Sequence, residues 1–215
     1  MTAIVLAGGN SRRLGRNKAL ELFGEGPLLQ RVIDAVSQID DDIIVVAASK
    51  GQLPKLGPHI RIAIDCCKPG SAALIGLYTG LKEATSFYSL VVGCDMPYLN
   101  VKLLRYIVDA AQGFDAAIPR IGRFIEPLHA VYSKSCLEPM RSQIDNGNLQ
   151  ISPLVQKVNV RFVEEGEIDR FDPQHLSFVN INSERDLKRA KTVMESVAAV
   201  KAGDKLKAIK IEDEQ

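Results

Sequence analysis

Residues 3–18 read AIVLAGGNSRRLGRNK, in which a short apolar run leads into a glycine-rich loop with three arginines and a final lysine. The apolar run is typical of a buried strand in an α/β sheet, so the loop would begin where that strand ends. Glycine lets a backbone approach an anion closely, its N–H groups bond to phosphate oxygens, and arginine and lysine neutralise charge. We interpret the loop as a polyphosphate site. The alternative is a glycine-rich turn with solvated basic residues.

The loop departs from two common phosphate-binding motifs. Gly15 is followed by Arg16-Asn17-Lys18 rather than by the lysine and hydroxyl residue of a Walker A motif. The loop also contains no G-x-G-x-x-G dinucleotide fingerprint. Neither of these nucleotide-binding classes is therefore indicated.

The first half of the chain alternates strand and helix patterns. Aliphatic runs at 43–48, 60–65 and 89–94 predict buried strands, and the patterns at 29–36 and 73–84 predict helices between them. Asn100 is placed to cap a further helix. These alternations predict an α/β fold with a doubly wound, mostly parallel, Rossmann-like sheet.

The second half is less regular. We expect short strands at 115–119, 127–132, 160–163 and 178–182, followed by a helix that a capping box of Ser183 and Asp186 opens. The prediction is one nucleotidyltransferase domain over residues 1–200, with a nucleotide side at about 1–112 and an acceptor side at about 113–200. Lysines and acidic residues dominate 201–215, which we expect to be a mobile tail.

Composition excludes several classes of protein. The net charge of +1 gives no pull on a nucleic-acid backbone, and no apolar run is long enough for a membrane span or a signal-peptide core. Four cysteines, Cys66, Cys67, Cys94 and Cys136, lack the spacing of zinc ligands and are interpreted as reduced thiols. We expect a cytoplasmic protein with neither nucleic acid nor membrane as a partner.

Asp95 is the leading candidate for a metal ligand. It ends an apolar run, within Gly93-Cys94-Asp95-Met96-Pro97. A carboxylate at a strand end can hold magnesium, which usually bridges to substrate phosphates, although an aspartate can also simply cap the next turn. In a doubly wound sheet the first strand lies beside the strand that follows the reversal. Asp95 and the glycine-rich loop would then flank one crevice.

Four segments, taken in order, resemble the molybdenum cofactor guanylyltransferases: 6–18, 94–97, 126–132 and 178–182. That family has the nucleotide-diphospho-sugar transferase-like fold and transfers GMP from GTP to molybdopterin, releasing pyrophosphate, with magnesium as cofactor. The resemblance implies a magnesium-dependent nucleotidyltransferase whose substrates are GTP and molybdopterin or molybdenum cofactor. It also implies transient contact with molybdoenzymes or cofactor-delivery proteins.

The resemblance further implies roles for individual residues. Contacts with the nucleotide would come from six residues: Leu6, Ala7, Gly8, Gly9, Lys18 and Asp65. The catalytic set would be Lys18 and Arg13, which hold the triphosphate, and Asp95, which binds Mg²⁺. Contacts with the acceptor would come from Asn180, Asn182 and His129.

Some positions differ from the family pattern, and they concern the choice of base. Ala47 stands where many bacterial members have asparagine, and Ala72 and Ala73 stand where Gly-Pro is common. The preference for guanine then depends largely on Gly8 and Gly9. Three alternatives stay open: a cytidylyltransferase, a nucleotidyltransferase for a sugar phosphate or other phosphorylated metabolite, and a non-catalytic nucleotide-binding module.

Arginines near the acceptor side allow two interpretations. Arg120 and Arg123 flank a glycine just before the 126–132 segment, and they would either reach the acceptor's phosphate or be solvated. His59 and His175 are interpreted as surface or packing residues.

Overall fold

The structure is a computed structural model that describes residues 1–8, 17–65 and 72–201 of the 215-residue chain. The predictions for Gly9 and Arg13, and the predicted mobility of the tail beyond residue 201, concern positions outside these ranges. Within them, no helix is long and apolar enough to cross a membrane.

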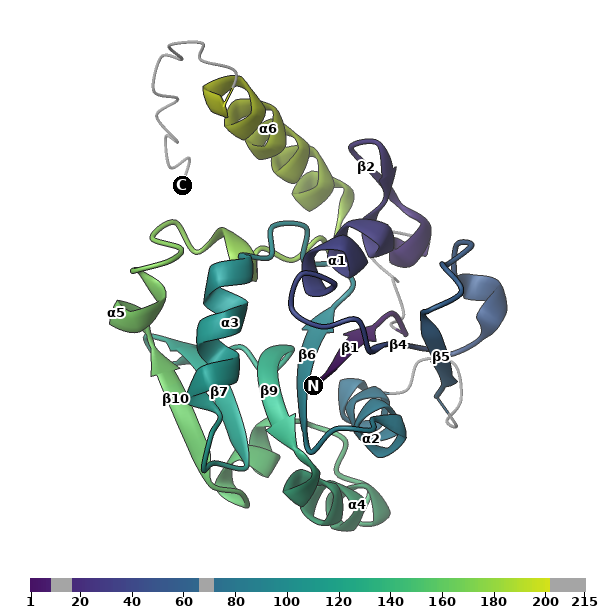
Figure 1. Cartoon of the computed structure of the whole chain (residues 1–215), viewed down its shortest axis with the longest axis vertical. Coiled ribbons are helices and arrows are strands. Elements are labelled where there is room, and N and C mark those ends of the chain that lie inside the picture. Colours follow the sequence, from purple (N-terminus) through teal and green to yellow (C-terminus); the bar gives the residue numbers. More distant parts are fainter. Residues whose placement is uncertain (9–16, 66–71, 202–215) are drawn as a thin grey trace.

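An eight-stranded sheet forms the centre of the molecule (Figure 1). Its strands are β1 (Thr2–Leu6), β4 (Ile43–Ala47), β5 (Arg61–Ile64), β6 (Tyr88–Gly93), β7 (Ala116–Ile121), β8 (Phe124–Ile125), β9 (His129–Ser133) and β10 (Val160–Glu164). The order is β10-β7-β9-β6-β1-β4-β5, and β8 pairs with β7. Strand β9 is antiparallel to β6 and β7, while β1, β4, β5 and β6 are parallel to their neighbours within that group. The predicted doubly wound, mostly parallel α/β sheet is confirmed.

Helices cover both faces of the sheet. They are α1 (Leu28–Val36), α2 (Ala73–Glu83), α3 (Val101–Ala110), α4 (Leu137–Asp145), α5 (Glu165–Ile168) and α6 (Glu184–Lys201). Alternate residues of β1 face opposite layers: Ala3 and Val5 pack in the core with α1 and α3, and Ile4 packs with α2 and α4. The period-two alternation of a buried strand thus produces two cores, one on each side.

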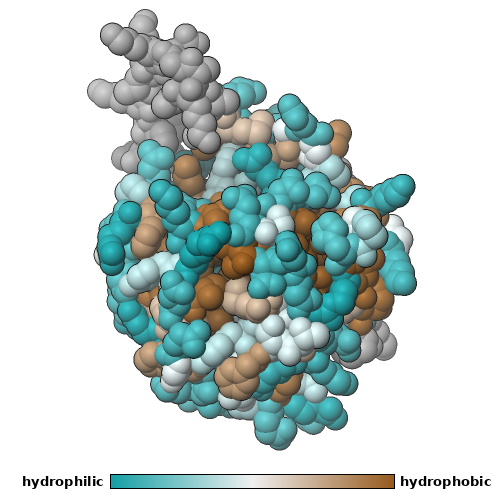
Figure 2. Space-filling view, viewed as in Figure 1, coloured by the Kyte–Doolittle hydropathy of each residue, from teal (hydrophilic) through white to brown (hydrophobic). Residues whose placement is uncertain are grey.

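Shorter elements complete the chain. A small hairpin of β2 (Leu22–Phe23) and β3 (Gly26–Pro27) stands apart from the main sheet. The 3₁₀-helices are Lys18–Leu20, Lys50–Gln52, Lys134–Cys136, Ser152–Gln156 and Leu176–Phe178. On the face seen in Figure 2 the surface is mainly hydrophilic, with apolar residues visible in places between the polar ones.

Two predicted helix starts are confirmed by their caps. The side chain of Asn100 accepts hydrogen bonds from the N–H groups of Lys102 and Leu103 at the start of α3. Ser183 Oγ accepts from the Asp186 N–H (3.2 Å) immediately before α6. Short polar side chains at these positions satisfy N–H groups that have no partner within the helix.

The predicted strand at 178–182 is wrong. The chain there leaves the 3₁₀-helix Leu176–Phe178 and continues without strand pairing. Two features favour the 3₁₀ turn: His175 adopts φ 52°, and the carboxylate of Asp172 accepts from the N–H groups of Leu176 and Ser177. The segment then passes beyond the end of β6, where the Ile181 N–H donates to the Asp95 carbonyl (2.9 Å). Without a strand beside it, the apolar and polar alternation does not produce a ladder.

Helix α2 packs unusually close to β1. A Cβ atom built on Gly80 would lie 2.5 Å from Ile4 Cγ2 in the middle of that strand. We predict that Gly80→Leu lowers the free energy of unfolding by about 1–3 kcal/mol through overpacking, whereas Lys82→Leu, on an exposed position of the same helix, changes it by about 0.5 kcal/mol or less. Urea denaturation of both variants measures the difference. Equal stabilities would contradict the close packing.

Candidate active site

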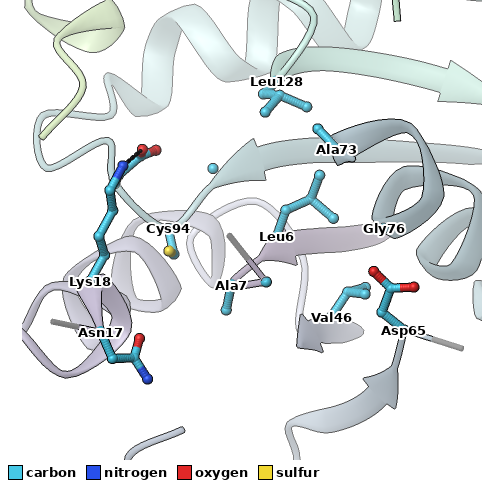
Figure 3. Close-up of a pocket in the computed structure, with 13 residues that line it drawn as sticks. Leu6, Ala7, Asn17, Lys18, Val46, Asp65, Ala73, Gly76, Cys94 and Leu128 are labelled. Atoms are coloured by element: carbon cyan, nitrogen blue, oxygen red, sulfur yellow. Dashed lines mark hydrogen bonds and ion pairs between the residues drawn. The ribbon is translucent and has the colours of Figure 1, made fainter. Parts of the chain in front are cut away.

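The parallel strands end together at one edge of the sheet. Leu6, the last residue of β1, pairs with Gly93 of β6 and with Val46 of β4. A pocket of about 170 Å³ opens at this edge (Figure 3). Its lining consists of Leu6, Ala7, Gly8, Asn17, Lys18, Val46, Asp65, Ala73, Gly76, Gly93, Cys94, Asp95 and Leu128. The predicted crevice between the first strand and the strand carrying Asp95 is therefore present.

A lysine, a carboxylate and an amide meet at this end of the sheet. Lys18 Nζ donates to Asp95 Oδ2 (2.8 Å) and to Asn182 Oδ1 (2.6 Å). The side chain of Lys18 is 16% exposed and that of Asp95 is 21% exposed, so both are largely shielded from water. Charges shielded in this way interact more strongly than a surface ion pair. The lysine-aspartate contact is drawn in Figure 3.

Local structure places each member of this trio. Lys18 opens a 3₁₀-helix whose cap is Asn17, with Oδ1 accepting from the Ala19 N–H (3.0 Å). Asp95 lies in the turn after β6. Asn182 lies just before α6, and its N–H donates to Asp186 Oδ2 (3.1 Å). The three positions are thus set by a helix cap, a strand end and a second helix start.

The oxygens of the trio suit a divalent cation. A carboxylate oxygen and an amide oxygen converge on one cationic nitrogen, so the ammonium of Lys18 stands where a metal ion would find hard oxygen ligands. Among the described residues, His, Cys, Asp and Glu form no group of three or more that could hold a metal. A cation here would complete its shell with water and phosphate oxygens, as Mg²⁺ commonly does. The residues present therefore fit Mg²⁺.

The residues expected to contact the nucleotide lie together. Leu6, Ala7, Gly8, Lys18 and Asp65 all line the pocket. Asp65 is 5% exposed, and its N–H extends the pairing of β5 by donating to the Ala47 carbonyl (2.9 Å). Packing also explains why position 8 is a glycine, since a Cβ atom built there would lie 3.3 Å from the backbone nitrogen of Ala48. It permits a close approach between the ends of β1 and β4.

Cys94 lines the pocket without being a nucleophile. Burial, together with the neighbouring charge of Asp95, raises the pKa of its thiol to about 12. Only a thiolate attacks readily. The thiol therefore stays protonated at neutral pH, and Cys94 acts as an apolar wall.

The residues expected on the acceptor side are less concentrated. Asn182 joins the trio, whereas the Asn180 amide donates to the Phe178 carbonyl (3.2 Å) and is not in the pocket lining. Arg120 forms an ion pair with Glu164 and stacks on Phe162. The roles of Asn180 and Asn182 toward an acceptor stay predictions, and the pairing of Arg120 favours a structural role.

His129 is buried beneath this region. It is 0% exposed, its ring packs against Phe178 (4.8 Å between centroids), and neither ring nitrogen has a hydrogen-bond partner among the described residues. Burial lowers the pKa of His129 to about 4, although the charge of Asp172 opposes this shift. In this conformation His129 supports Phe178, and its predicted contact with the acceptor stays a prediction.

The neutral His129 predicts a pH-dependent stability. Its ordinary pKa is 6.5 and its folded pKa is about 4, so between these values the unfolded chain binds the extra proton. The contribution is complete above about pH 6.5 and is lost as pH falls toward 4. From pH 7.5 to 5 we expect a loss of about 2 kcal/mol in the free energy of unfolding.

Variants at two histidines test this assignment by urea denaturation at both pH values. His129→Leu should remove that part of the pH dependence, because the titrating ring is gone. The matched change at the exposed His59 should leave it in place. If His129→Leu still lost the same free energy of unfolding between pH 7.5 and pH 5, groups other than His129 would be its cause.

The fold and the site together define a class of protein. The mostly parallel sheet, with a lysine and a carboxylate at one edge, matches the nucleotide-diphospho-sugar transferase-like fold of the structural relatives. The family model of the MobA-like NTP transferase domain matches residues 3–158, and the chain belongs to this family. It is a nucleotidyltransferase.

Relatives agree with this assignment over nearly the whole chain. A protein of Methanosarcina mazei named probable molybdenum cofactor guanylyltransferase is 38% identical, over 86% of this chain and 88% of its own length. The molybdenum cofactor guanylyltransferase of Desulfosudis oleivorans is 34% identical, over 94% and 97%. The crystal structure of molybdopterin-guanine dinucleotide biosynthesis protein A from Archaeoglobus fulgidus superposes with a TM-score of 0.79, at 26% identity, over 91% of this chain and all of that one. The family resemblance inferred from four segments is confirmed.

Sequence reasoning missed some of the pocket wall. Val46, Gly76 and Leu128 line it alongside the predicted residues. Gly76 had a usable signal, because glycines at positions 76 and 80 share a face of one helix and indicate close packing against a strand. Val46 and Leu128 carry only an apolar pattern, which does not distinguish pocket from core.

Proposed function

We propose that the chain transfers GMP from GTP to the terminal phosphate of molybdopterin, releases pyrophosphate and depends on Mg²⁺. The observation that carries this proposal is the contact of Lys18 with Asp95 and Asn182 beside the pocket at the end of β1. The names of the relatives at 34–38% identity support the choice of substrates. Together they favour a reaction between two phosphorylated molecules that needs cationic groups and oxygen ligands.

Asp95 and Asn182 would hold Mg²⁺ through their side-chain oxygens, and the ion would supply charge neutralisation at the phosphates. Lys18 Nζ is bonded to both of these oxygens, so it would leave them when the ion binds. Its ammonium would then be free to bond to phosphate oxygens of the nucleotide. Arg13 would add a second positive charge from the loop.

The reaction requires no protein nucleophile. A phosphate oxygen of the acceptor attacks the α-phosphorus of GTP, the bond to the bridging oxygen of pyrophosphate breaks, and pyrophosphate leaves as an anion. The protein contributes position and charge, which are the main terms in phosphoryl-type transfer. The protonated Cys94 thiol does not compete as a nucleophile.

Base recognition would occur on the side of the pocket away from Lys18, where Asp65 lies (Figure 3). The buried carboxylate of Asp65 lines it, together with the backbone of Ala7 and Gly8. Guanine presents the N1–H and the N2 amino group side by side, and a carboxylate group can accept from two such donors. Cytosine offers one amino group. This difference favours GTP over CTP.

A pyrophosphate-release assay tests the proposed function. With molybdopterin and Mg²⁺ present, we expect kcat/KM for GTP to exceed that for CTP by about 100-fold, because cytosine would leave one of the two hydrogen bonds to the carboxylate unmade. A preference for CTP would favour the cytidylyltransferase alternative. Turnover with a sugar phosphate but not with molybdopterin would favour the metabolite branch, and GTP binding without any turnover would favour a non-catalytic module.

The setting of this reaction would be the cytoplasm, with delivery of the product to molybdoenzymes or to cofactor-delivery proteins. The free, buried thiols of Cys94 and Cys136 are compatible with a reducing compartment.

A further inference from the structure

The three residues of the trio come from distant parts of the chain. Lys18 is 77 residues from Asp95 and 164 residues from Asn182. None of the three lies within a strand of the main sheet, so strand pairing does not fix their relative positions. Other contacts must hold the three segments together.

A small apolar cluster lies where these segments meet. We call it the satellite cluster; it consists of Phe23, Leu28, Ile181, Leu187 and Ala190, with Tyr98 and Met194 packed against it. In Figure 1 the elements that supply it, the β2 hairpin, α1 and the start of α6, lie close together at the upper end of the molecule. Each segment that carries a trio residue therefore also contributes to this cluster.

Tyr98 contacts every one of the three segments. It follows Asp95 by three residues on the same turn. Its ring meets Phe23 edge to face (5.8 Å, 80°), and Phe23 follows Lys18 by five residues. Its hydroxyl donates to the carbonyl of Ala190 in α6, the helix that begins two residues after Asn182. Burial raises the pKa of Tyr98, so the hydroxyl remains a donor.

Arg31, in α1, also contacts the turn that carries Asp95 and Tyr98. Its guanidinium lies 5.3 Å from the Phe23 ring centroid and 5.9 Å from that of Tyr98. Its Nε donates to the Pro97 carbonyl (2.6 Å), between Asp95 and Tyr98. A planar guanidinium suits this combination of stacking and a fixed hydrogen bond. The turn is thus held from both sides.

We propose that Tyr98 is a positioning residue, which keeps Lys18, Asp95 and Asn182 in register through the satellite cluster. The role in turnover rests on the proposed function, whereas the role in holding Lys18 does not. Tyr98 is absent from the pocket lining, so it acts through the residues that it places. Charged groups that act together on phosphates need their geometry held closely, which gives such a support a measurable effect.

The first test measures how firmly Lys18 is held, without nucleotide or metal. In the wild type, Lys18 Nζ is bonded to two oxygens, so it should react slowly with an amine-acetylating reagent. Peptide mass spectrometry follows acetylation of Lys18 over time. Tyr98→Ala should raise its rate about 5-fold, equivalent to the loss of about one hydrogen bond. Tyr98→Phe, which keeps the ring, should stay nearer to the wild type.

Tyr88 provides a matched control at the other end of β6. It also meets a phenylalanine edge to face (Phe87, 4.9 Å), and its hydroxyl also donates to a backbone carbonyl (Phe114, 3.1 Å). Tyr88→Ala should therefore cost similar packing but leave Lys18 acetylation unchanged. Equal rates in Tyr98→Ala and Tyr88→Ala would overturn the proposal.

The second test is turnover. Tyr98→Ala should lower kcat for pyrophosphate release about 10-fold, because the reacting groups are displaced. In a Lys18→Ala background the same change should lower kcat by less than 10-fold, since one of the three residues that Tyr98 positions is already gone. If the effects of the two substitutions on kcat were fully additive in this double-mutant cycle, Tyr98 would contribute only to general stability and the proposal would be overturned. A wild type that neither binds GTP nor turns over refutes the proposed function, while the acetylation rates still decide the positioning role.

A substitution on the surface tests the same proposal if Tyr98→Ala does not fold. Arg31 is exposed, and Arg31→Ala removes the bond to Pro97 while leaving both rings in place. The control is Arg105→Ala, because Arg105 also donates to a backbone carbonyl, that of Gln38. Faster acetylation of Lys18 in Arg31→Ala alone supports the proposal, and equal rates in the two variants overturn it.

Discussion

Asp95→Asn is expected to lower kcat for pyrophosphate release by about 100-fold or more, the usual cost of removing a group that stabilises developing charge. The change keeps the size of the side chain but removes its negative charge. Lys18 Nζ lies 2.8 Å from Asp95 Oδ2, so this carboxylate is the negative partner of the trio. Asparagine would leave Asn182 without a charged co-ligand for Mg²⁺.

A second aspartate provides the control for this prediction. Asp42 also forms an ion pair with a cation, Arg61 (2.5 Å), and it lies just before β4, at the opposite end of the sheet. Asp42→Asn removes a paired carboxylate as well, and it should leave kcat within about 3-fold, since surface pairs of this kind contribute little. Initial rates at saturating GTP, below the unfolding temperature of each variant, give the comparison. An Asp95→Asn enzyme with undiminished turnover would refute the metal-binding role.

The fold was predictable from the sequence wherever a segment with a strand or helix pattern also has a neighbouring element to pair or pack with. The strand at 43–48 forms because its side chains are buried on both faces, and the observed strand Ile43–Ala47 is buried throughout. The segment 178–182 has an apolar and polar alternation that suits a strand, yet it crosses beyond the end of β6 and has no partner there. Whether a partner exists is a property of the tertiary structure, which the local pattern does not contain.

The site was predictable to the same extent. Lys18 and Asp95 could be assigned to one crevice because topology places the first and fourth parallel strands side by side. Their direct contact, and the third partner Asn182, depend on two loops and a helix start whose positions follow from packing in the satellite cluster. Tyr98 and Phe23 showed no more than ordinary apolar patterns. They are important because they support the contacts of Lys18 with Asp95 and with Asn182, which are 77 and 164 residues away from it in the sequence.

Lys18→Ala is expected to change two affinities in opposite directions. GTP should bind about 10-fold or more weakly, because a charged hydrogen bond to phosphate is lost. Mn²⁺ alone, used as a spectroscopic probe for Mg²⁺, should bind more tightly. The ammonium of Lys18 repels a divalent cation and occupies the oxygens of Asp95 and Asn182, and its removal frees both of them.

Lys134 supplies a control with similar contacts in another place. Its Nζ donates to the carbonyls of Leu81 (2.6 Å), Lys82 (3.3 Å) and Ala84 (2.7 Å) at the end of α2, and it touches no residue of the trio. Lys134→Ala should therefore leave both affinities unchanged. Calorimetry measures GTP binding, and electron paramagnetic resonance measures free Mn²⁺ without nucleotide. If Mn²⁺ affinity stays at the wild-type value in Lys18→Ala, then Asp95 and Asn182 do not form the cation site. If only GTP affinity stays unchanged, the cation site stands and the triphosphate is held by other groups.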